Sequence, residues 1–199
     1  MTTIYGTVSA LKATLSITAS TWDTDLTAAL TSASRAIDNE CGRSFYNSGS
    51  TVVRYYTPEI RSSLEIDDLD ELVEVAVDTA GTGSYATTWS AGTEFHLAPY
   101  NAAADAWPYE RLELRSQSGA SFPGYAKSVK VSGVWGWPSV PDAISQAAGI
   151  LASRLFKRAR EAPFSVYGVG LDGSPVRISR TDPDVAMLVK PYSRNVMIL

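Results

Sequence analysis

The clearest alternation of hydrophobic and polar positions lies between residues 129 and 160. From Val129 to Val134 the apolar positions recur at every second residue, which predicts a half-buried strand. Gly136 and Pro138 end that strand, and Pro141 suits the first position of a following helix, because its missing N–H has no partner there. One face of that helix, predicted from Pro141 to about Arg160, carries Ile144, Ala147, Ala148, Leu151 and Leu155.

Residues 7–42 show helical spacing as well. Val8, Leu11 and Leu15 predict a short helix, and a longer one follows up to Gly42. Thr21 is the expected N-cap of the longer helix, and Gly42 is expected to end it in the left-handed conformation. The apolar face of this second helix comprises Leu26, Ala29, Leu30, Ala33 and Ile37.

The stretch between about residues 50 and 135 has the short alternating runs and turn signals of an all-β region. Gly-containing turns such as Gly81-Thr82-Gly83 separate the runs, and their regular spacing predicts a small antiparallel sandwich or barrel. The expected strands are Thr51–Tyr56, Glu71–Val77, Tyr85–Trp89, Glu94–Leu97, Arg111–Leu114 and Lys127–Val134.

Residues 161–199 are rich in Gly and Pro and lack a pattern that would fold alone. A short strand at 176–180 and one or two helical turns at 184–189 are the elements expected there. The segment either packs on its own domain or orders as an arm against a partner, and we favour the arm. The chain is therefore predicted to be α+β: a helical bundle at 1–48 and 138–160, an inserted β domain at 49–137, and an extended C-terminal arm at 161–199.

Composition narrows the class of protein. The chain has 199 residues, 45% of them hydrophobic, which is long enough for one good core. Its net charge of −4 argues against general electrostatic binding of nucleic acid. A single cysteine, Cys41, excludes an intrachain disulfide, and we interpret it as a buried small side chain. Neither a membrane span nor a secretory signal is indicated, so we expect a cytoplasmic location or a particle assembled there.

Candidate chemistry is sparse. The acidic run from Asp67 to Glu74 lacks the glycine of a calcium loop, and we interpret it as a solvated acidic edge. His96, the single histidine, alternates with apolar residues on a predicted strand, so a structural role is favoured over a hydrolase centre. The glycines 168, 170 and 173 match a GxGxxG string, but no clear strand precedes them and no helix follows. We therefore expect no enzyme activity, no metal and no cofactor.

Two groups of side chains favour binding surfaces. One is the group of aromatic side chains of the β region, which fits either a β-domain core with interface anchors, which we favour, or a carbohydrate-binding platform. It comprises Trp89, Trp107, Tyr109, Trp135 and Trp137. The basic residues at the end of the third helix either cap it or contact DNA or an acidic partner. The candidates for a subunit interface are Arg154, Lys157 and Arg158 on this helix, together with Arg43.

The combination of segments resembles the head–tail connector proteins (head completion or adaptor proteins) of tailed bacteriophages. The matching features run in order along most of the chain. They are Leu26–Arg43; the Trp89–Phe95 and Asn101–Leu112 segments of the β region; the VKVSGVWGWPSVPDAI junction; and the late Asp182–Val185 and Pro191-Tyr192. The specific features are two taken together: the end of the second helix, Cys41-Gly42-Arg43-x-Phe45, and the corner of the junction. This corner comprises Gly133, Trp135, Gly136, Trp137, Pro138 and Pro141.

The resemblance implies a non-enzymatic ring, commonly twelvefold, in the neck of a virion. Such a ring docks under the portal, extends the DNA channel without sequence-specific DNA binding, and joins the portal to the next connector or tail component. The resemblance also implies that the C-terminal segment engages the portal. The expected portal-binding residues are Arg160, Phe164, Tyr167, Val176, Arg177, Ile178, Arg180, Met187, Leu188 and Tyr192. The alternative function is a virion decoration or binding module that uses the aromatic-rich β domain.

Overall fold

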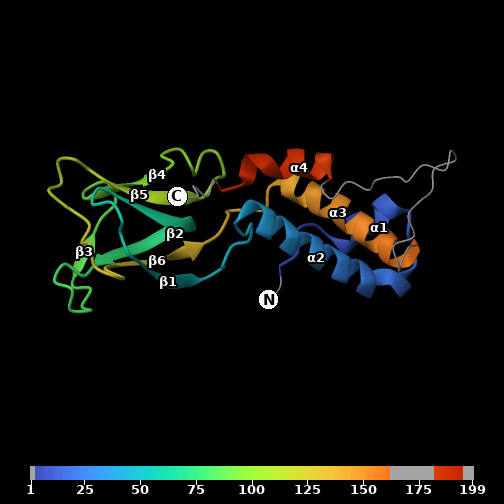
Figure 1. Cartoon of the computed structure of the whole chain (residues 1–199), viewed down its shortest axis with the longest axis horizontal. Coiled ribbons are helices and arrows are strands. Elements are labelled where there is room, and N and C mark those ends of the chain that lie inside the picture. Colours follow the sequence, from blue (N-terminus) through green and yellow to red (C-terminus); the bar gives the residue numbers. More distant parts are fainter. Residues whose placement is uncertain (1–2, 162–181, 195–199) are drawn as a thin grey trace, which may run out of the picture. The chain divides into compact units, whose positions relative to one another are not determined.

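The computed structural model of the protein describes residues 3–161 and 182–194. The chain divides into two compact units, one made of Met1–Ser44 with Val140–Leu199 and the other of Phe45–Ser139. The first unit contains the helices and the second the strands (Figure 1). The predicted α+β fold class is confirmed.

The helical unit is built on three helices, α1 (Val8–Leu15), α2 (Asp23–Cys41) and α3 (Asp142–Glu161). Each packs on the other two. Since every apolar position predicted for α2 is buried, the helical spacing alone identified the face that meets α3. The buried side chains of this unit include Tyr5, Leu11, Leu26, Leu30, Ala33, Ile37, Ile144, Ala147, Ala148, Ala152 and Phe156.

Of the two predictions made for the ends of α2, one is confirmed and one is wrong. Gly42 has a left-handed φ of +63°, as expected for a residue that ends a helix. Thr21 is not the N-cap, because it lies inside a 3₁₀ turn, η1 (Ser20–Trp22), that runs directly into the helix. The helix α3 begins at Asp142, one residue after the predicted start, and the Pro141 carbonyl accepts its first N–H groups.

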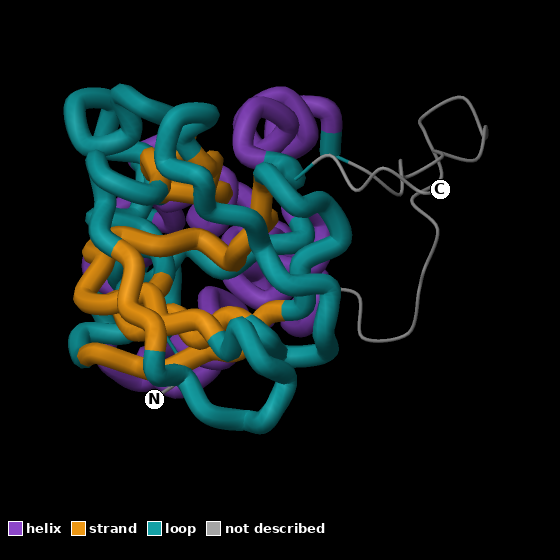
Figure 2. The backbone as a smooth tube through the Cα atoms, turned by 90° about the vertical axis from the view of Figure 1, so that its left-hand side faces the viewer, coloured by secondary structure: helices purple, strands orange, loops and turns teal. Residues whose placement is uncertain are grey.

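The β unit contains a strand at each of the six predicted places, but the prediction Glu71–Val77 covers only the second half of β2. One six-stranded antiparallel sheet has the order β1-β6-β2-β5-β4, and β3 pairs with β2 outside this path. Figure 2 shows its strands in orange and the long connecting loops in teal. The strands are β1 (Thr51–Tyr56), β2 (Ser63–Val77), β3 (Thr87–Trp89), β4 (Phe95–Ala98), β5 (Tyr109–Leu114) and β6 (Val129–Trp135).

In place of the predicted small antiparallel sandwich or barrel, the structure has one six-stranded sheet, which a single long strand organises. β2 has 15 residues, pairs with β5 in its first half and with β6 and β3 in its second half, and changes register at irregularities along the way. Such irregularities bend a strand and increase its twist. The core of this unit is formed mainly by side chains of the strands themselves. It comprises Leu64, Ile66, Leu69, Val75, Val77, Trp89, Phe95, Leu112, Phe122, Val129, Val131 and Trp135.

Part of the predicted C-terminal arm lies on the helical unit of its own chain. The expected helical turns are present as α4 (Pro183–Val189), followed by the 3₁₀ turn η2 (Lys190–Tyr192), and α4 packs on α3. Val189 is buried and its carbonyl lies 3.8 Å from the Cys41 thiol. The Arg194 N–H donates to the Cys41 carbonyl at 2.9 Å. The predicted strand at 176–180 lies outside the described residues.

Candidate interface surfaces

The corner at the end of β6 depends on two glycines. Gly136 has φ +110°, and a Cβ placed on it would lie 1.7 Å from the Tyr46 carbonyl oxygen. Its N–H donates to the Asp68 carbonyl at 2.7 Å. A Cβ on Gly133 would lie 2.5 Å from the Glu71 carbonyl oxygen. Both positions therefore require a residue without a side chain.

The two tryptophans of the corner are buried anchors. The Trp137 indole donates to the buried Asp68 carboxylate at 3.0 Å, and its ring lies 4.5 Å from that of Trp107. The Trp135 indole donates to the Val52 carbonyl at 2.7 Å. Pro138 is exposed and Pro141 is half-buried. The corner thus positions backbone and core, and its aromatic rings do not form a binding surface.

The acidic run does not lie at an edge of the sheet, as we had expected, because it belongs to β2, which has neighbouring strands on both sides. Glu71 is exposed, while other members of the run have partners within the β unit. Asp67 pairs with Arg54 at 2.6 Å, and Glu74 pairs with Lys130 at 3.0 Å. The role of Asp68 beneath Trp137 was missed, since a run of carboxylates carries no signal of which member is buried.

A second buried carboxylate, Asp78, organises the loop after β2. Its two oxygens accept four backbone N–H groups from residues 80–83, at 2.7–3.2 Å. Burial raises the pKa of Asp78, but the four N–H donors together lower it by more. The pKa of Asp78 therefore lies below the ordinary 3.8. The Asp-Thr-Ala-Gly-Thr-Gly sequence was interpreted only as a turn, although Asp before glycines is typical of this local bonding.

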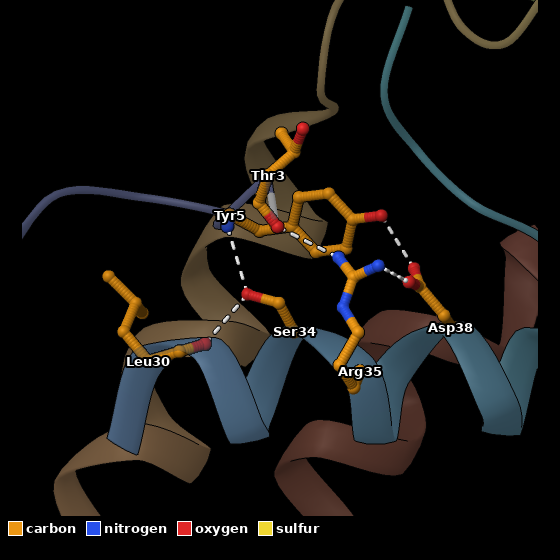
Figure 3. A network of polar contacts seen from close by, with 6 residues as sticks. All are labelled: Thr3, Tyr5, Leu30, Ser34, Arg35 and Asp38. Carbon is orange, nitrogen blue, oxygen red and sulfur yellow. Dashed lines mark hydrogen bonds and ion pairs between the residues drawn. The ribbon is translucent and has the colours of Figure 1, made fainter. Parts of the chain in front are cut away.

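A polar network attaches the N-terminal segment to α2 (Figure 3). The Tyr5 hydroxyl donates to Asp38 at 2.5 Å, and Arg35 pairs with the same carboxylate at 2.8 Å. The Tyr5 N–H donates to the Ser34 hydroxyl at 2.9 Å, and Arg35 also donates to the Thr3 carbonyl. Burial raises the pKa of Asp38, while Tyr5 and Arg35 lower it in part. The network is a structural tether because each group already bonds within the unit.

The candidate subunit-interface residues differ in how much of each side chain is already engaged within its own chain. Arg154 pairs with the buried Asp182 at the start of α4. Arg43 is 9% exposed, which leaves little of it for a neighbouring subunit. Lys157 and Arg158 are exposed on the last turns of α3.

The candidate portal-binding residues fall into three groups. Met187 is 69% exposed on α4, while Leu188 and Tyr192 are half-buried. Arg160 is exposed, and its guanidinium lies 3.8 Å from the centroid of the Trp22 ring in the same chain. Phe164, Tyr167, Val176, Arg177, Ile178 and Arg180 lie outside the described residues.

The tryptophans of the β unit do not provide a flat platform for a sugar ring. Trp89, Trp135 and Trp137 are each at most 8% exposed, and Trp107 and Tyr109 are half-buried. The exposed large apolar side chains are instead mainly tyrosines and aliphatic residues. They are Tyr46, Val52, Val53, Tyr55, Ile60, Val73, Tyr100, Tyr125 and Met187.

No group of three His, Cys, Asp or Glu side chains within residues 3–161 and 182–194 is placed to hold a metal ion. His96 is exposed on β4, and its ring packs edge-on against Tyr100 at 6.0 Å. Over the same part of the chain, every helix is too short or too polar to cross a membrane.

Comparison with known proteins reveals similarity in structure. Neither a protein-family model nor a curated protein matches the chain. A chain in the neck of an empty gene transfer agent (GTA) particle, computed with C6 symmetry, matches with a TM-score of 0.55 at 16% identity. That match covers 95% of this chain and 89% of the other. A chain in the neck of the native particle, computed with C12 symmetry, matches equally well over 94% and 87%. At this identity the likeness establishes a shared fold.

Proposed function

We propose that the protein is a structural, non-enzymatic component of the neck of a phage-like particle. In this proposal its copies form a ring under the portal, extend the DNA channel and join the portal to the next connector or tail component. The observation that carries the proposal is a fold shared over nearly the whole chain with a subunit found in such necks. The order of the sequence segments, which resembles that of head–tail connectors, supports it independently.

The charge distribution is compatible with a channel role. The β unit, residues 45–139, contains twelve Asp and Glu residues against six Lys and Arg residues, whereas the rest of the chain is slightly basic. An acidic balance limits contacts between cationic side chains and phosphates, so DNA can pass without adhering.

The described part of the C-terminal segment supplies one side chain suited to portal contact. Met187 exposes 69% of its surface on α4, while Val189 on the same helix is buried. An exposed methionine adapts to varied apolar pockets, which makes it a good contact residue for a partner. We therefore place Met187 at the portal contact.

The test is negative-stain imaging of the purified chain mixed with the portal protein of the same particle. Added ring density at the narrow end of the portal is the expected result. Met187→Glu should abolish this density without lowering the thermal midpoint, because the side chain is exposed. Val73→Glu is the matched control, since Val73 is 57% exposed on β2 and should dock normally.

Absence of density with the wild type would contradict the proposed function. Normal docking of Met187→Glu would contradict only the assignment of α4 to the portal contact. The alternative, a saccharide-binding module, predicts quenching of tryptophan fluorescence by sugars, and the burial of Trp89, Trp135 and Trp137 gives it no support.

A further inference from the structure

Three tyrosines from distant segments gather at one end of the β unit. Tyr55 lies on β1, Tyr85 precedes β3, and Tyr125 precedes β6. The Tyr55 and Tyr85 rings lie 5.5 Å apart, and the Tyr85 hydroxyl donates to the Lys127 carbonyl at 2.5 Å. Tyr55 is 51% exposed and Tyr125 is 49% exposed. The three side chains, with Gly81 against Tyr125, form a tyrosine patch suited to binding.

The ring of Tyr125 has one covered face and one open face. A Cβ placed on Gly81 would lie 3.5–3.6 Å from three consecutive ring atoms, Cγ, Cδ2 and Cε2. Such equal distances place Gly81 against the face of the ring and not against its edge. Because Tyr125 nevertheless exposes about half of its surface, the opposite face is the one available to a ligand. The ring therefore offers a flat apolar platform.

The loops that carry the tyrosine patch are held in place by their own hydrogen bonds. Asp78 accepts four backbone N–H groups of the loop that leads to Tyr85. In the loop of Tyr125, the Lys127 N–H donates to the Thr57 hydroxyl oxygen at 2.8 Å. The Ser128 hydroxyl donates to the Pro123 carbonyl at 2.9 Å. A surface that is already ordered loses less conformational entropy on binding, which favours affinity.

The surroundings of the tyrosine patch are rich in hydroxyl groups and poor in charge. Residues 79–88 contain no acidic or basic side chain, and the Asp78 carboxylate is occupied by backbone donors. Ser, Thr and Ala are scarce among the residues that dominate protein–protein binding, so this composition favours a hydroxylated, uncharged ligand over a protein. The hydroxyl-bearing residues of this segment are Thr79, Thr82, Ser84, Tyr85, Thr87 and Thr88.

We propose that the tyrosine patch binds an uncharged oligosaccharide. One sugar ring stacks its apolar C–H face on the open face of Tyr125, and the hydroxyl groups of residues 79–88 bond to those of the adjoining sugar units. Tyr85 holds the loop and Tyr55 in position, because its hydroxyl and its ring are both engaged within the chain. The site uses tyrosines in place of the buried tryptophans. It goes beyond the proposed neck function and does not depend on it.

Isothermal titration calorimetry of the full chain with two neutral sugars, cellohexaose and chitohexaose, tests the proposal. At least one should bind with a dissociation constant below ~1 mM. Tyr125→Leu should weaken that binding at least ~10-fold, because leucine still packs on Gly81 but has no flat ring. Tyr125→Phe should bind like the wild type, since stacking needs no hydroxyl.

Tyr100→Leu is the matched control. Tyr100 is 66% exposed and follows β4, at the opposite edge of the sheet from β1, so its replacement should leave the affinity unchanged. Hydrogen exchange of the wild type is a second measurement, which needs no variant to fold. Saturating sugar should slow exchange in residues 79–86 and leave residues 95–104 unchanged.

Absence of binding by both sugars at ~10 mM would overturn the proposal. Equal weakening by Tyr125→Leu and Tyr100→Leu, or unchanged exchange in residues 79–86, would overturn it as well. If Tyr125→Leu lost assembly with the portal while neither sugar bound, the tyrosine patch would be a protein contact and the oligosaccharide would be rejected. Sugar binding without ring density at the portal would reject only the proposed neck function.

Discussion

Single backbone positions determine the geometry at the end of β6. Gly136 adopts φ +110° directly against the Tyr46 carbonyl, and Gly133 lies directly against the Glu71 carbonyl. These contacts cannot relax by rotating a side chain, because the opposing atoms belong to the backbone. Substitutions here should therefore be more costly than at the other glycines among the described residues.

Gly136→Ala should destabilise the β unit by at least ~2 kcal/mol, since it adds a steric clash to an unfavourable φ. Chemical denaturation followed by tryptophan fluorescence measures the change. Gly49→Ala is the matched control: its φ is +67°, but nothing lies within 4 Å of the added Cβ. A similar loss in both variants would show that φ alone sets the cost, and that the Tyr46 contact adds nothing.

The Asp78 carboxylate should make the stability of the β unit depend on acid pH. Its pKa in the folded protein is below the ordinary 3.8, so ionised Asp78 stabilises the fold. This contribution is complete above pH ~4 and is lost as pH falls through the folded pKa. Asp78→Asn should flatten the decline in thermal midpoint over that range.

Glu59→Gln, at an exposed position, is the control for removing one carboxylate. An unchanged pH profile for Asp78→Asn would show that the four N–H contacts do not stabilise the ionised form.

At the scale of elements, the contacts that a strand or helix makes with its neighbours explain how it is held in the fold. The sheet is organised by β2, whose 15 residues contact three other strands. The short helix α4, by contrast, is attached through the buried Val189, the ion pair of Asp182 with Arg154, and bonds to Cys41. Because an isolated helix of seven residues is unstable in water, α4 depends on these contacts.

Val189→Ala should loosen α4 selectively. The loss of two buried methyl groups costs ~1–2 kcal/mol, so amide hydrogens of α4 should exchange about 5- to 30-fold faster while those of α3 are unaffected. Met187→Ala is the control on the same helix, because Met187 is 69% exposed. Equal acceleration in both variants would mean that α4 opens for reasons unrelated to the burial of Val189. Hydrogen–deuterium exchange with mass spectrometry measures both.

At the scale of the whole molecule, the β unit is inserted between two segments of the helical unit. It has its own core, and its two ends meet where the Ser48 N–H bonds to the Trp135 carbonyl. An insertion whose ends are adjacent and whose core is internal satisfies the conditions for independent folding.

The isolated fragment 45–139 should therefore fold by itself. Circular dichroism should show β structure and a single cooperative thermal transition. The buried Trp137 and Trp135 should give the fragment a blue-shifted fluorescence that is lost on unfolding. A fragment without a cooperative transition would contradict the assignment of an independent core. The fragment carrying Gly136→Ala offers an internal comparison, since it should melt at a lower temperature.

Local patterns in the sequence predicted most of the elements. Helical spacing identified the buried face of α2 and part of that of α3, where Leu151 and Leu155 are only half-buried. Alternation located the strands apart from the first half of β2, and Gly42 and Gly136 marked the ends of α2 and β6, because these features depend on neighbouring residues alone. The order of the segments along the chain, which resembles that of head–tail connectors, also predicted a role in a virion neck.

Only the tertiary structure decided which strands pair and which polar groups are buried. The central place of β2, the single open sheet in place of a sandwich, and the burial of Asp68 under Trp137 all join residues distant along the chain. The same holds for α4, whose packing on α3 could not be read from its seven residues. The exposed edge of β1 likewise follows from strand order, which periodicity does not encode.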